Sequence, residues 1–184
     1  AREEFPELDA TGRGTVSIGR RLLDPLSELV KIEPQHIGVG MYQHDVGKKE
    51  LKESLDQVIE SCVNYVGVDL NTASASLLRH VSGLNQLIAR RVVEWRDQHG
   101  RFNNRRQLLE VSGLGEATFT QAAGFLKIAG GDEPLDGTWI HPESYSAANK
   151  VLERLSLSAQ SLLESEQARE ELRERISQLE AATL

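Results

Sequence analysis

The chain contains little or none of several features on which other classes of protein depend. Cys62 is its single cysteine, so no intrachain disulfide and no cysteine-based zinc site can form. No apolar run approaches the roughly 18 residues of a membrane-spanning helix, and the first residues lack the basic and apolar parts of a signal peptide. We therefore expect a cytoplasmic protein with no metal, no cofactor and no membrane partner.

Both ends of the sequence have the composition of interior segments. The chain opens in a polar stretch and stops inside a helical pattern that has no capping residue. We therefore expect a piece of a longer protein. Cys62 lies among apolar residues of a helical pattern, and we expect it to be a small buried core residue.

What the chain does have is a short turn sequence that occurs twice. The residues VSGLN at 81–85 return thirty positions later as VSGLG at 111–115. A Leu-Leu pair precedes each copy and a helical pattern follows it. Each copy therefore predicts a helix, a tight turn and a second helix, which is a helix-hairpin-helix unit.

The turn itself predicts a phosphate site. Gly83 and Gly113 can adopt positive φ without steric cost, and Asn85 and Gly115 also tolerate the left-handed region. Backbone N–H groups then point outward beside the unpaired donors and positive dipole end of the next helix. A phosphate oxygen fits there, so we expect sequence-independent, salt-sensitive binding of nucleic acid.

The charge distribution agrees with that expectation. The whole chain has a net charge of −7, but residues 72–130 hold eight Lys/Arg against four Asp/Glu, a net of +4, and the remainder carries −11. The alternative is a solvated helical face with ordinary arginine usage. The residues expected to contact nucleic acid are Gly83, Leu84, Asn85, Arg90, Arg91, Arg105, Arg106, Gly113 and Gly115.

The overall pattern predicts an all-α fold built on the tandem helix-hairpin-helix module. Flanking helices are expected at 15–32, with a break at Asp24-Pro25, at 50–64 and after His141-Pro142. An irregular or extended segment is expected near 37–46, and Asn71 or Thr72 as the next N-cap. The expected divisions are 1–47, a connecting helix at 48–71, the module at 72–130 and a helical extension at 131–184.

The core of the module is predicted from helical spacing. In the first unit the helix at 86–97 should bury four apolar residues, and the second unit, 105–128, should bury eight. These residues are Leu87, Ile88, Val92, Val93, Leu108, Leu109, Val111, Phe119, Ala122, Ala123, Phe125 and Leu126.

Several stretches resemble a known family. From about Arg13 onward the sequence is similar to the bacterial Tex family of transcription accessory proteins, and the likeness covers roughly residues 1–150. The matching stretches are 16–26, 37–46, 62–74, 121–128, 134–136 and 141–143.

The resemblance carries its own implications. Tex-like proteins have an RNase H-like domain, a tandem helix-hairpin-helix and an OB-fold RNA-binding domain. Residues 1–47 would then be the end of the RNase H-like domain. The resemblance implies binding of RNA or single-stranded DNA during transcription, with the transcription machinery as a further partner.

We expect no catalysis from this chain. By resemblance Asp24 occupies an acidic position of the RNase H-like fold, but metal-dependent cleavage needs several convergent carboxylates, and a helix cap before Pro25 is the favoured interpretation of Asp24. His44-Asp45 has no nucleophile at useful spacing. His80 and His99 flank the hairpins and are interpreted as surface residues.

A second class of function stays open. The hairpins would be pure helix connectors, and the acidic C-terminal helices would engage a protein. Glu116 follows hairpin two and would repel phosphate, whereas hairpin one is followed by Arg90-Arg91. If only one hairpin binds, we expect it to be the first.

Overall fold

The structure is a computed structural model that describes residues 2, 4–37, 40 and 44–183. Within these residues the fold is helical, which confirms the expected all-α class, with two short strands among the helices. The α-helices described are α1 (Ala10–Leu23), α2 (Pro25–Leu29), α3 (Lys48–Val66), α4 (Ala75–Leu78), α5 (Gln86–His99), α6 (Glu116–Ala122), α7 (Tyr145–Arg154), α8 (Ala159–Glu164) and α9 (Glu166–Thr183). The shorter elements are η1 (Pro34–Ile37), η3 (Arg105–Glu110), η4 (Ala123–Phe125), η5 (Pro134–Gly137), η6 (Pro142–Ser144), β1 (Val68–Asp69) and β2 (Leu126–Lys127).

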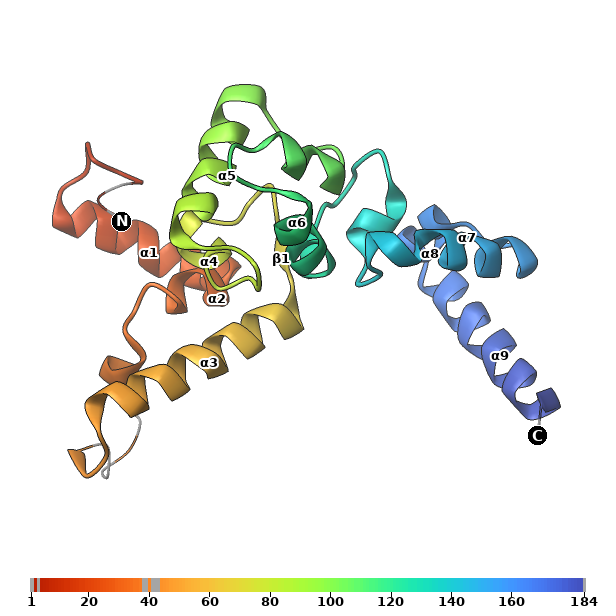
Figure 1. Ribbon diagram of the computed structural model, residues 1–184, viewed down its shortest axis with the longest axis horizontal. Helices are drawn as coiled ribbons and strands as arrows, with labels where there is room; N and C mark the ends of the chain where they lie inside the picture. The colour runs from red at the N-terminus through yellow and green to blue at the C-terminus, as the bar shows by residue number, and fades with distance from the viewer. Residues whose placement is uncertain (1, 3, 38–39, 41–43, 184) are drawn as a thin grey trace.

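The elements fall into three groups along the molecule (Figure 1). The helices α1 and α2 lie beside a central group built around α5. The helices α7, α8 and α9 extend away on the other side, and α3 projects as a long arm. Among the helices of these described ranges, none is long and apolar enough to cross a membrane.

The predicted break between the first two helices is confirmed. The helix α1 ends at Leu23, and Pro25 occupies the first turn of α2, where its missing N–H costs nothing. The Asp24 carboxylate accepts a hydrogen bond from the Ser27 N–H at 3.1 Å. Asp24 is thus the N-cap of α2. Of the irregular segment expected near 37–46, residues 38–39 and 41–43 lie outside the described residues.

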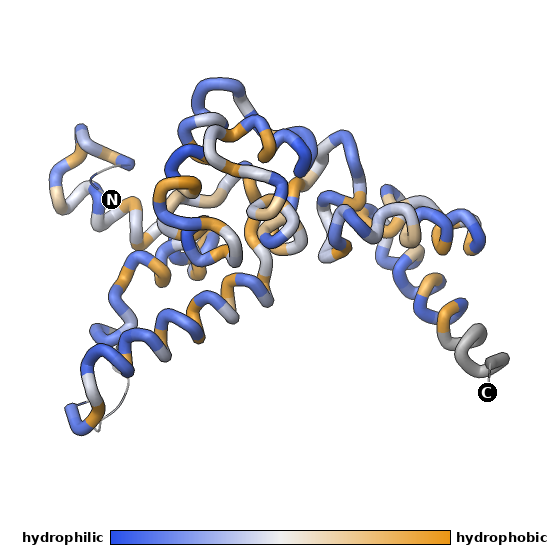
Figure 2. The backbone as a smooth tube through the Cα atoms, viewed as in Figure 1, coloured by the Kyte–Doolittle hydropathy of each residue, from blue (hydrophilic) through white to orange (hydrophobic). Residues whose placement is uncertain are grey.

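The helix α3 extends the predicted helix at 50–64 by two residues at each end, and Gly67 terminates it with φ +72°. Val63 is the buried residue of this helix, and Cys62 beside it is exposed. The expectation of a buried Cys62 is therefore wrong. Apolar residues recur along the arm (Figure 2), and Leu51, Leu55 and Ile59 are partly buried. Other apolar side chains of the arm, those of Val58, Tyr65 and Val66, are exposed.

The buried residues of the core cluster are Val30, which follows α2, and residues within 63–128. The prediction from helical spacing that Leu87 is buried is wrong, because its side chain is 55% exposed while Ile88 and Val92 are buried. Val93, Leu109 and Phe125 are partly buried. The fully buried side chains of this region include Val63, Val68, Leu70, Leu78, Val81, Val92, Phe102, Leu108, Leu126 and Ile128.

The first capping residue of the module also differs from expectation. Ser74 caps α4 by accepting from the Leu77 N–H at 3.3 Å. Asn71 and Thr72 instead donate their N–H groups to the Asp69 carboxylate, at 2.8 and 3.0 Å. The chain makes one further turn before the helix begins.

A pair of two-residue strands closes the module. The strands β1 and β2 pair in parallel, with Val68 opposite Leu126 and Asp69 opposite Lys127. The two ends of the repeat, almost sixty residues apart, therefore lie side by side. The hairpins are held between these ends.

Candidate nucleic-acid interface

Hairpin one is a tight turn between α4 and α5. Gly83 has φ +86°, as the sequence predicts, and the Leu84 N–H donates to the Val81 carbonyl at 3.0 Å. Asn85 has an extended backbone, with φ −102°, and its side chain caps α5 by accepting from the Ile88 N–H at 2.9 Å. Asn85 thus serves as a cap and does not adopt the left-handed conformation.

Hairpin two repeats this geometry without the side-chain cap. Gly113 has φ +86°, and the Leu114 N–H donates to the Val111 carbonyl at 3.0 Å. Gly115 is the N-cap of α6 with an extended φ of −92°, and it has no side chain to cap with. The two turns share one backbone design.

The two hairpins pack against each other reciprocally. A Cβ placed on Gly83 would lie 2.9 Å from the Cβ of Gln121 on α6. A Cβ on Gly113 would strike the guanidinium of Arg91 on α5. Gly83 and Gly113 are thirty residues apart, and so are Arg91 and Gln121. The two hairpins are therefore related by an approximate two-fold axis, with the turn of each packed against the second helix of the other.

The turns present backbone donors. Among the described residues, no hydrogen-bond acceptor reaches several N–H groups of either turn. The helix α5 has 14 residues and α6 has seven, so the longer α5 has more aligned peptide dipoles behind its donors. The N–H groups concerned are those of Gly83, Asn85, Gln86 and Leu87 in hairpin one and of Gly113, Gly115, Glu116, Ala117 and Thr118 in hairpin two.

Two of the predicted contact residues serve the interior of the protein. Leu84 is 7% exposed and its N–H is bonded within the turn, so the prediction that it contacts nucleic acid is wrong. Arg105 is 1% exposed and cannot reach a ligand. The position of Leu84 in the repeat and the charge of Arg105 favoured contact with a ligand, but burial overrides both.

Most cations of the basic segment bond to the protein's own backbone. Five of the eight donate to carbonyl oxygens. Exposed side chains are found at Arg79, Arg90, Arg101 and Arg106. The bonds run from Arg91 to Ser112 (2.9 Å), from Arg96 to Leu70 and Ala73 (3.1 and 3.0 Å), from Arg101 to Ala129 (3.3 Å), from Lys127 to Val66 (3.3 Å), and from Arg105 to three carbonyls.

Arg79 is a candidate that the repeat alone did not single out. Its guanidinium lies 3.4 Å from the Gln86 side-chain oxygen at the start of α5. The adjacent His80 is partly buried, and this burial, together with the charge of Arg79, lowers the pKa of His80 below its ordinary value. His80 is therefore neutral near pH 7 and adds no charge to the site.

A carboxylate near hairpin one also escaped the sequence argument. The Ser82 hydroxyl donates to Glu60 of α3 at 2.8 Å, and the Asn64 side chain bonds both the N–H and the hydroxyl of Ser82. Each hairpin thus has one acidic neighbour, Glu60 or Glu116. Glu60 lies 22 residues before Ser82 in sequence, so only the packing of α3 brings it close.

A third turn joins α7 to α8 and shares a positive φ and an N-cap with hairpin one, although its Leu157 N–H donates to the Leu152 carbonyl, five residues back. Ser156 has φ +54°, and two residues later Ser158 caps α8 by accepting from the Ser161 N–H at 3.0 Å. Gly83 and Asn85 stand in the same relation in hairpin one. This turn has no glycine and does not share the VSGL sequence, so it carries no repeat signal.

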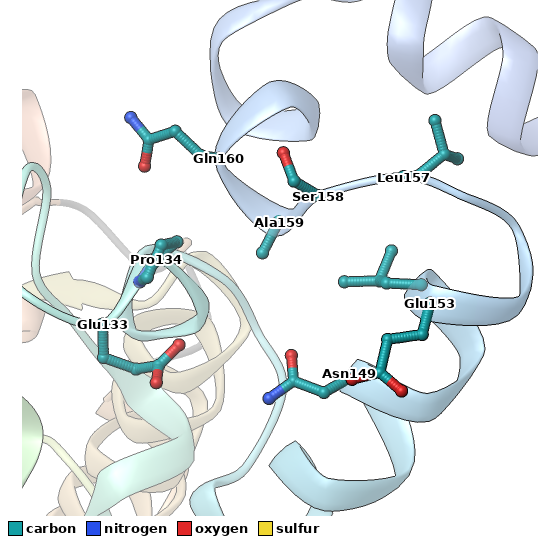
Figure 3. Close-up of a pocket in the computed structure, with 9 residues that line it drawn as sticks. Glu133, Pro134, Asn149, Glu153, Leu157, Ser158, Ala159 and Gln160 are labelled. Atoms are coloured by element: carbon teal, nitrogen blue, oxygen red, sulfur yellow. The ribbon is translucent and has the colours of Figure 1, made fainter.

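The third turn borders a hollow of about 330 Å³ in which acidic side chains gather (Figure 3). Glu133, beside Pro134, faces Asn149 and Glu153 of α7 across it. The carboxylates of Glu133 and Glu153 would repel a phosphate bound at this turn, because they line the same hollow as Ser158. The candidate nucleic-acid surface is therefore the pair of hairpins within 63–127.

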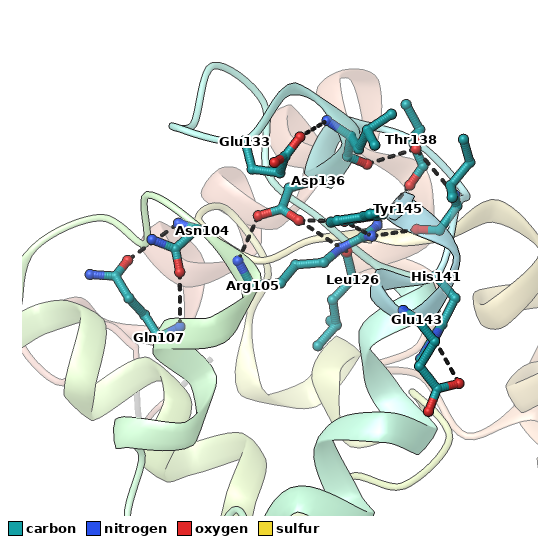
Figure 4. A network of polar contacts seen from close by, with 12 residues as sticks. Asn104, Arg105, Gln107, Leu126, Glu133, Asp136, Thr138, His141, Glu143 and Tyr145 are labelled. Atoms are coloured by element: carbon teal, nitrogen blue, oxygen red, sulfur yellow. Dashed lines mark hydrogen bonds and ion pairs between the residues drawn. The ribbon is translucent and has the colours of Figure 1, made fainter. Parts of the chain in front are cut away.

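Arg105 is the centre of a buried polar network (Figure 4). Its guanidinium donates to the carbonyls of Leu126, Thr138 and Ile140 at 2.6 to 2.7 Å and to the Tyr145 hydroxyl at 2.6 Å. Asp136, 2% exposed, accepts from the Arg105 N–H at 2.7 Å and from the Tyr145 hydroxyl. Burial and the hydrogen bond to Asp136 raise the pKa of Tyr145 well above its usual range. The network joins the hairpin module to the segment that follows.

Two separate family models match the hairpin module and the segment that follows it. A family model described as a helix-hairpin-helix motif matches residues 63–127, and one described as an HHH domain matches residues 133–183. The second match contains the turn at Ser156. The divisions expected at 47, 71 and 130 remain predictions.

Proteins of known sequence match nearly the whole chain. The transcriptional accessory protein Tex of Neisseria gonorrhoeae is 54% identical over 182 residues, 99% of this chain and 23% of its own length. The protein tex of Bordetella pertussis is 54% identical over 165 residues, 90% of this chain and 21% of its own. The human S1 RNA-binding domain-containing protein 1 is 57% identical over 128 residues, 70% of this chain and 13% of its own. The chain thus spans less than a quarter of the length of these relatives.

Proposed function

The chain belongs to the Tex family of transcriptional accessory proteins, and we propose that its hairpin module binds the backbone of nucleic acid without reading base sequence. The observation that carries the proposal is the pair of positive-φ turns, each with N–H groups that lack an acceptor among the described residues. Such donors at a helix N-terminus suit a phosphate oxygen.

We propose RNA or single-stranded DNA as the nucleic acid, bound in the course of transcription. The names of the relatives support this choice, since one is called a transcriptional accessory protein and another an S1 RNA-binding domain protein. The exposed side chains of Arg79, Arg90 and Arg106 supply positive charge that attracts the phosphates.

We further propose that this chain cleaves no nucleic acid. The carboxylate of Asp24 is engaged as the cap of α2, and metal-assisted hydrolysis requires several carboxylates around one ion. Labelled RNA and DNA should stay intact with magnesium or manganese. Cleavage that disappears in Asp24→Asn would overturn this part.

The second candidate function is a protein-interaction scaffold. It is favoured by residues 131–184, which hold eleven Asp/Glu against five Lys/Arg, a net of −6. The two functions are compatible, because the acidic segment lies beyond the hairpin module. The binding experiment below tests the first of them.

Fluorescence anisotropy with a single-stranded oligonucleotide at two salt concentrations tests the main proposal. Affinity should fall steeply with salt, because each neutralised phosphate releases counterions. Arg79→Ala with Arg90→Ala should weaken binding and flatten the salt slope by up to about two units if both contact phosphates. Lys49→Ala is the matched control, since Lys49 is an exposed cation at the start of α3, far from the hairpins (Figure 1).

Two outcomes would contradict the proposal. Binding that is indifferent to salt would exclude backbone phosphates as the main ligand. An equal loss from Lys49→Ala and from the arginine variants would show that only net charge matters, and that the hairpins form no site.

A further inference from the structure

Two exposed aromatic rings line one hollow next to hairpin one. Tyr65, in the last turn of α3, is 84% exposed, and Trp139, just after η5, is 53% exposed. Together with Asn64 and Val66 they line an open hollow of about 530 Å³. These residues come from segments more than seventy positions apart, so the fold and not local sequence brings the rings together. We call it the Tyr65–Trp139 hollow.

The Trp139 ring is held in place by contacts with Lys127 and Gly67. The Lys127 ammonium lies 3.2 Å from the ring centroid, a cation–π contact, and also donates to the Val66 carbonyl. Gly67 packs against the ring edge so closely that a Cβ there would lie 3.0 Å from Cζ3 of Trp139. The ring is thus a fixed surface whose orientation costs nothing further when a ligand binds.

The hollow is tied directly to the turn of hairpin one. Asn64 lines the hollow, and the same side chain donates to the Ser82 hydroxyl at 3.0 Å and accepts from the Ser82 N–H at 3.1 Å. Ser82 precedes Gly83, whose N–H is one of the donors assigned to phosphate. A strand held at that turn therefore passes the edge of the hollow.

The chemistry of the lining suits a flat, uncharged ring. Among the described residues, those that line the hollow carry no charge, and Lys127 contacts a face of the Trp139 ring. Proteins commonly hold single strands with cationic side chains that contact the phosphates and with aromatic side chains on which the bases stack. Stacking is available only to a base that is not already paired and stacked in a duplex.

We propose that the Tyr65–Trp139 hollow binds an unpaired nucleobase of the strand whose phosphates lie at hairpin one. This inference rests on the proposed function, because the phosphates at the turn deliver the base. It makes the module a binder of single strands, although the hairpins by themselves do not distinguish single strands from duplexes.

The test compares two oligonucleotides of one length, one with bases and one abasic, which carry the same phosphates. The protein should bind the strand with bases about fivefold to a hundredfold more tightly for one stacked base. Trp139→Ala should abolish most of that preference and leave abasic binding and its salt slope unchanged. Trp139→Phe should retain much of the preference, since a ring remains.

Val58→Ala is the matched control for removal of an exposed apolar side chain, since Val58 lies on the same helix as Tyr65. Val58 is 58% exposed on α3 and does not line the hollow. Far-UV circular dichroism establishes that each variant is folded.

The possible failures are distinguishable. Equal affinity of the wild type for both strands would overturn the base site and leave backbone binding intact. No binding of either strand would refute the proposed function itself. If Trp139→Ala weakened both strands equally in a folded protein, the ring would act on the fold of hairpin one, and the inference would again be overturned.

Discussion

Three glycines with left-handed backbone angles differ in their surroundings. Gly83, Gly100 and Gly113 have φ of +86°, +88° and +86°. An added Cβ at Gly100 meets nothing within 4 Å, whereas at Gly113 it meets the mobile end of Arg91. At Gly83 it meets the Cβ of Gln121 and the main-chain oxygen of Thr118, which are both fixed by α6. Substitution of these glycines should therefore lower the unfolding free energy by different amounts, although their φ angles are nearly equal.

Substitution of each glycine by alanine measures these costs. At Gly83 and Gly113 the positive φ alone should cost an alanine about 1–2 kcal/mol of unfolding free energy. The loss should be larger for Gly83→Ala than for Gly113→Ala, because only at Gly83 must the backbone shift. Gly100→Ala should also be destabilising although its Cβ has space, because φ +88° with ψ −163° is a conformation that glycine alone adopts readily. Urea unfolding followed by circular dichroism gives the three values. Equal losses at Gly83 and Gly113 would show that the reciprocal packing contributes nothing.

At the same scale, the sequence predicts backbone geometry better than side-chain role. The glycine turns follow from residue type, since positive φ is a local property. The partners of Arg91, Arg96 and Arg105 are carbonyls 21 to 35 residues away, and no spacing rule reveals them. Charge counted along the sequence thus overstates the charge that is offered to a ligand.

At the scale of the elements, the helices follow from periodicity and their burial does not. The helix α3 is predicted almost to its ends. Cys62 of α3 and Leu87 of α5 are nevertheless exposed, because a helix that is covered on one narrow side buries fewer residues than its apolar stripe suggests. The strand pair and the third turn were missed for another reason. Two-residue strands have no period, and Ser156 carries no glycine signal.

The junction of α1 and α2 predicts an acid-sensitive contact. Glu28 of α2 is 3% exposed, accepts from the Ser17 hydroxyl of α1 at 2.7 Å and from Lys31 at 2.8 Å. Burial acts to raise the pKa of Glu28, but the hydrogen bonds and charge of Lys31 and the hydrogen bond of Ser17 outweigh it, so the pKa lies below its ordinary value. The carboxylate thus stabilises the fold in its ionised form.

The stabilisation by Glu28 should be present above the pKa of an unfolded glutamate, about 4.3, and should fade as the pH falls from there toward the lower folded value. Glu28→Gln should therefore lose less unfolding free energy than the wild type between pH 7 and pH 3. Urea midpoints at the two pH values give the comparison. Glu53→Gln, an exposed partner of Lys49, should behave as the wild type. An identical acid loss in both variants would refute the role of Glu28.

At the scale of the whole molecule, two helix-hairpin-helix regions meet at one buried arginine. Residues 63–127 and 133–183 match separate family models, and Arg105 binds groups from both. A buried guanidinium that donates to three carbonyls and a hydroxyl is satisfied only while Leu126, Thr138, Ile140 and Tyr145 stay in place. The network therefore makes the order of one region depend on the other.

Removal of this arginine should uncouple the two regions. Arg105→Met leaves the carboxylate of Asp136 buried without its cation, which should cost about 3–5 kcal/mol of unfolding free energy. In a Trp139→Phe background, Trp95 fluorescence reports on the module, where Trp95 stacks on Phe102 at 4.2 Å, and circular dichroism reports on all helices.

With Arg105 present, the two signals should share one urea midpoint, as expected of a cooperative unit. In Arg105→Met the circular dichroism should begin to fall at lower urea than the Trp95 fluorescence, because α7, α8 and α9 lose their attachment while the module core persists. Arg106→Met removes a neighbouring cation that is exposed and should change stability by no more than about 0.5 kcal/mol. Coincident transitions in Arg105→Met would mean that contacts other than this network couple the regions.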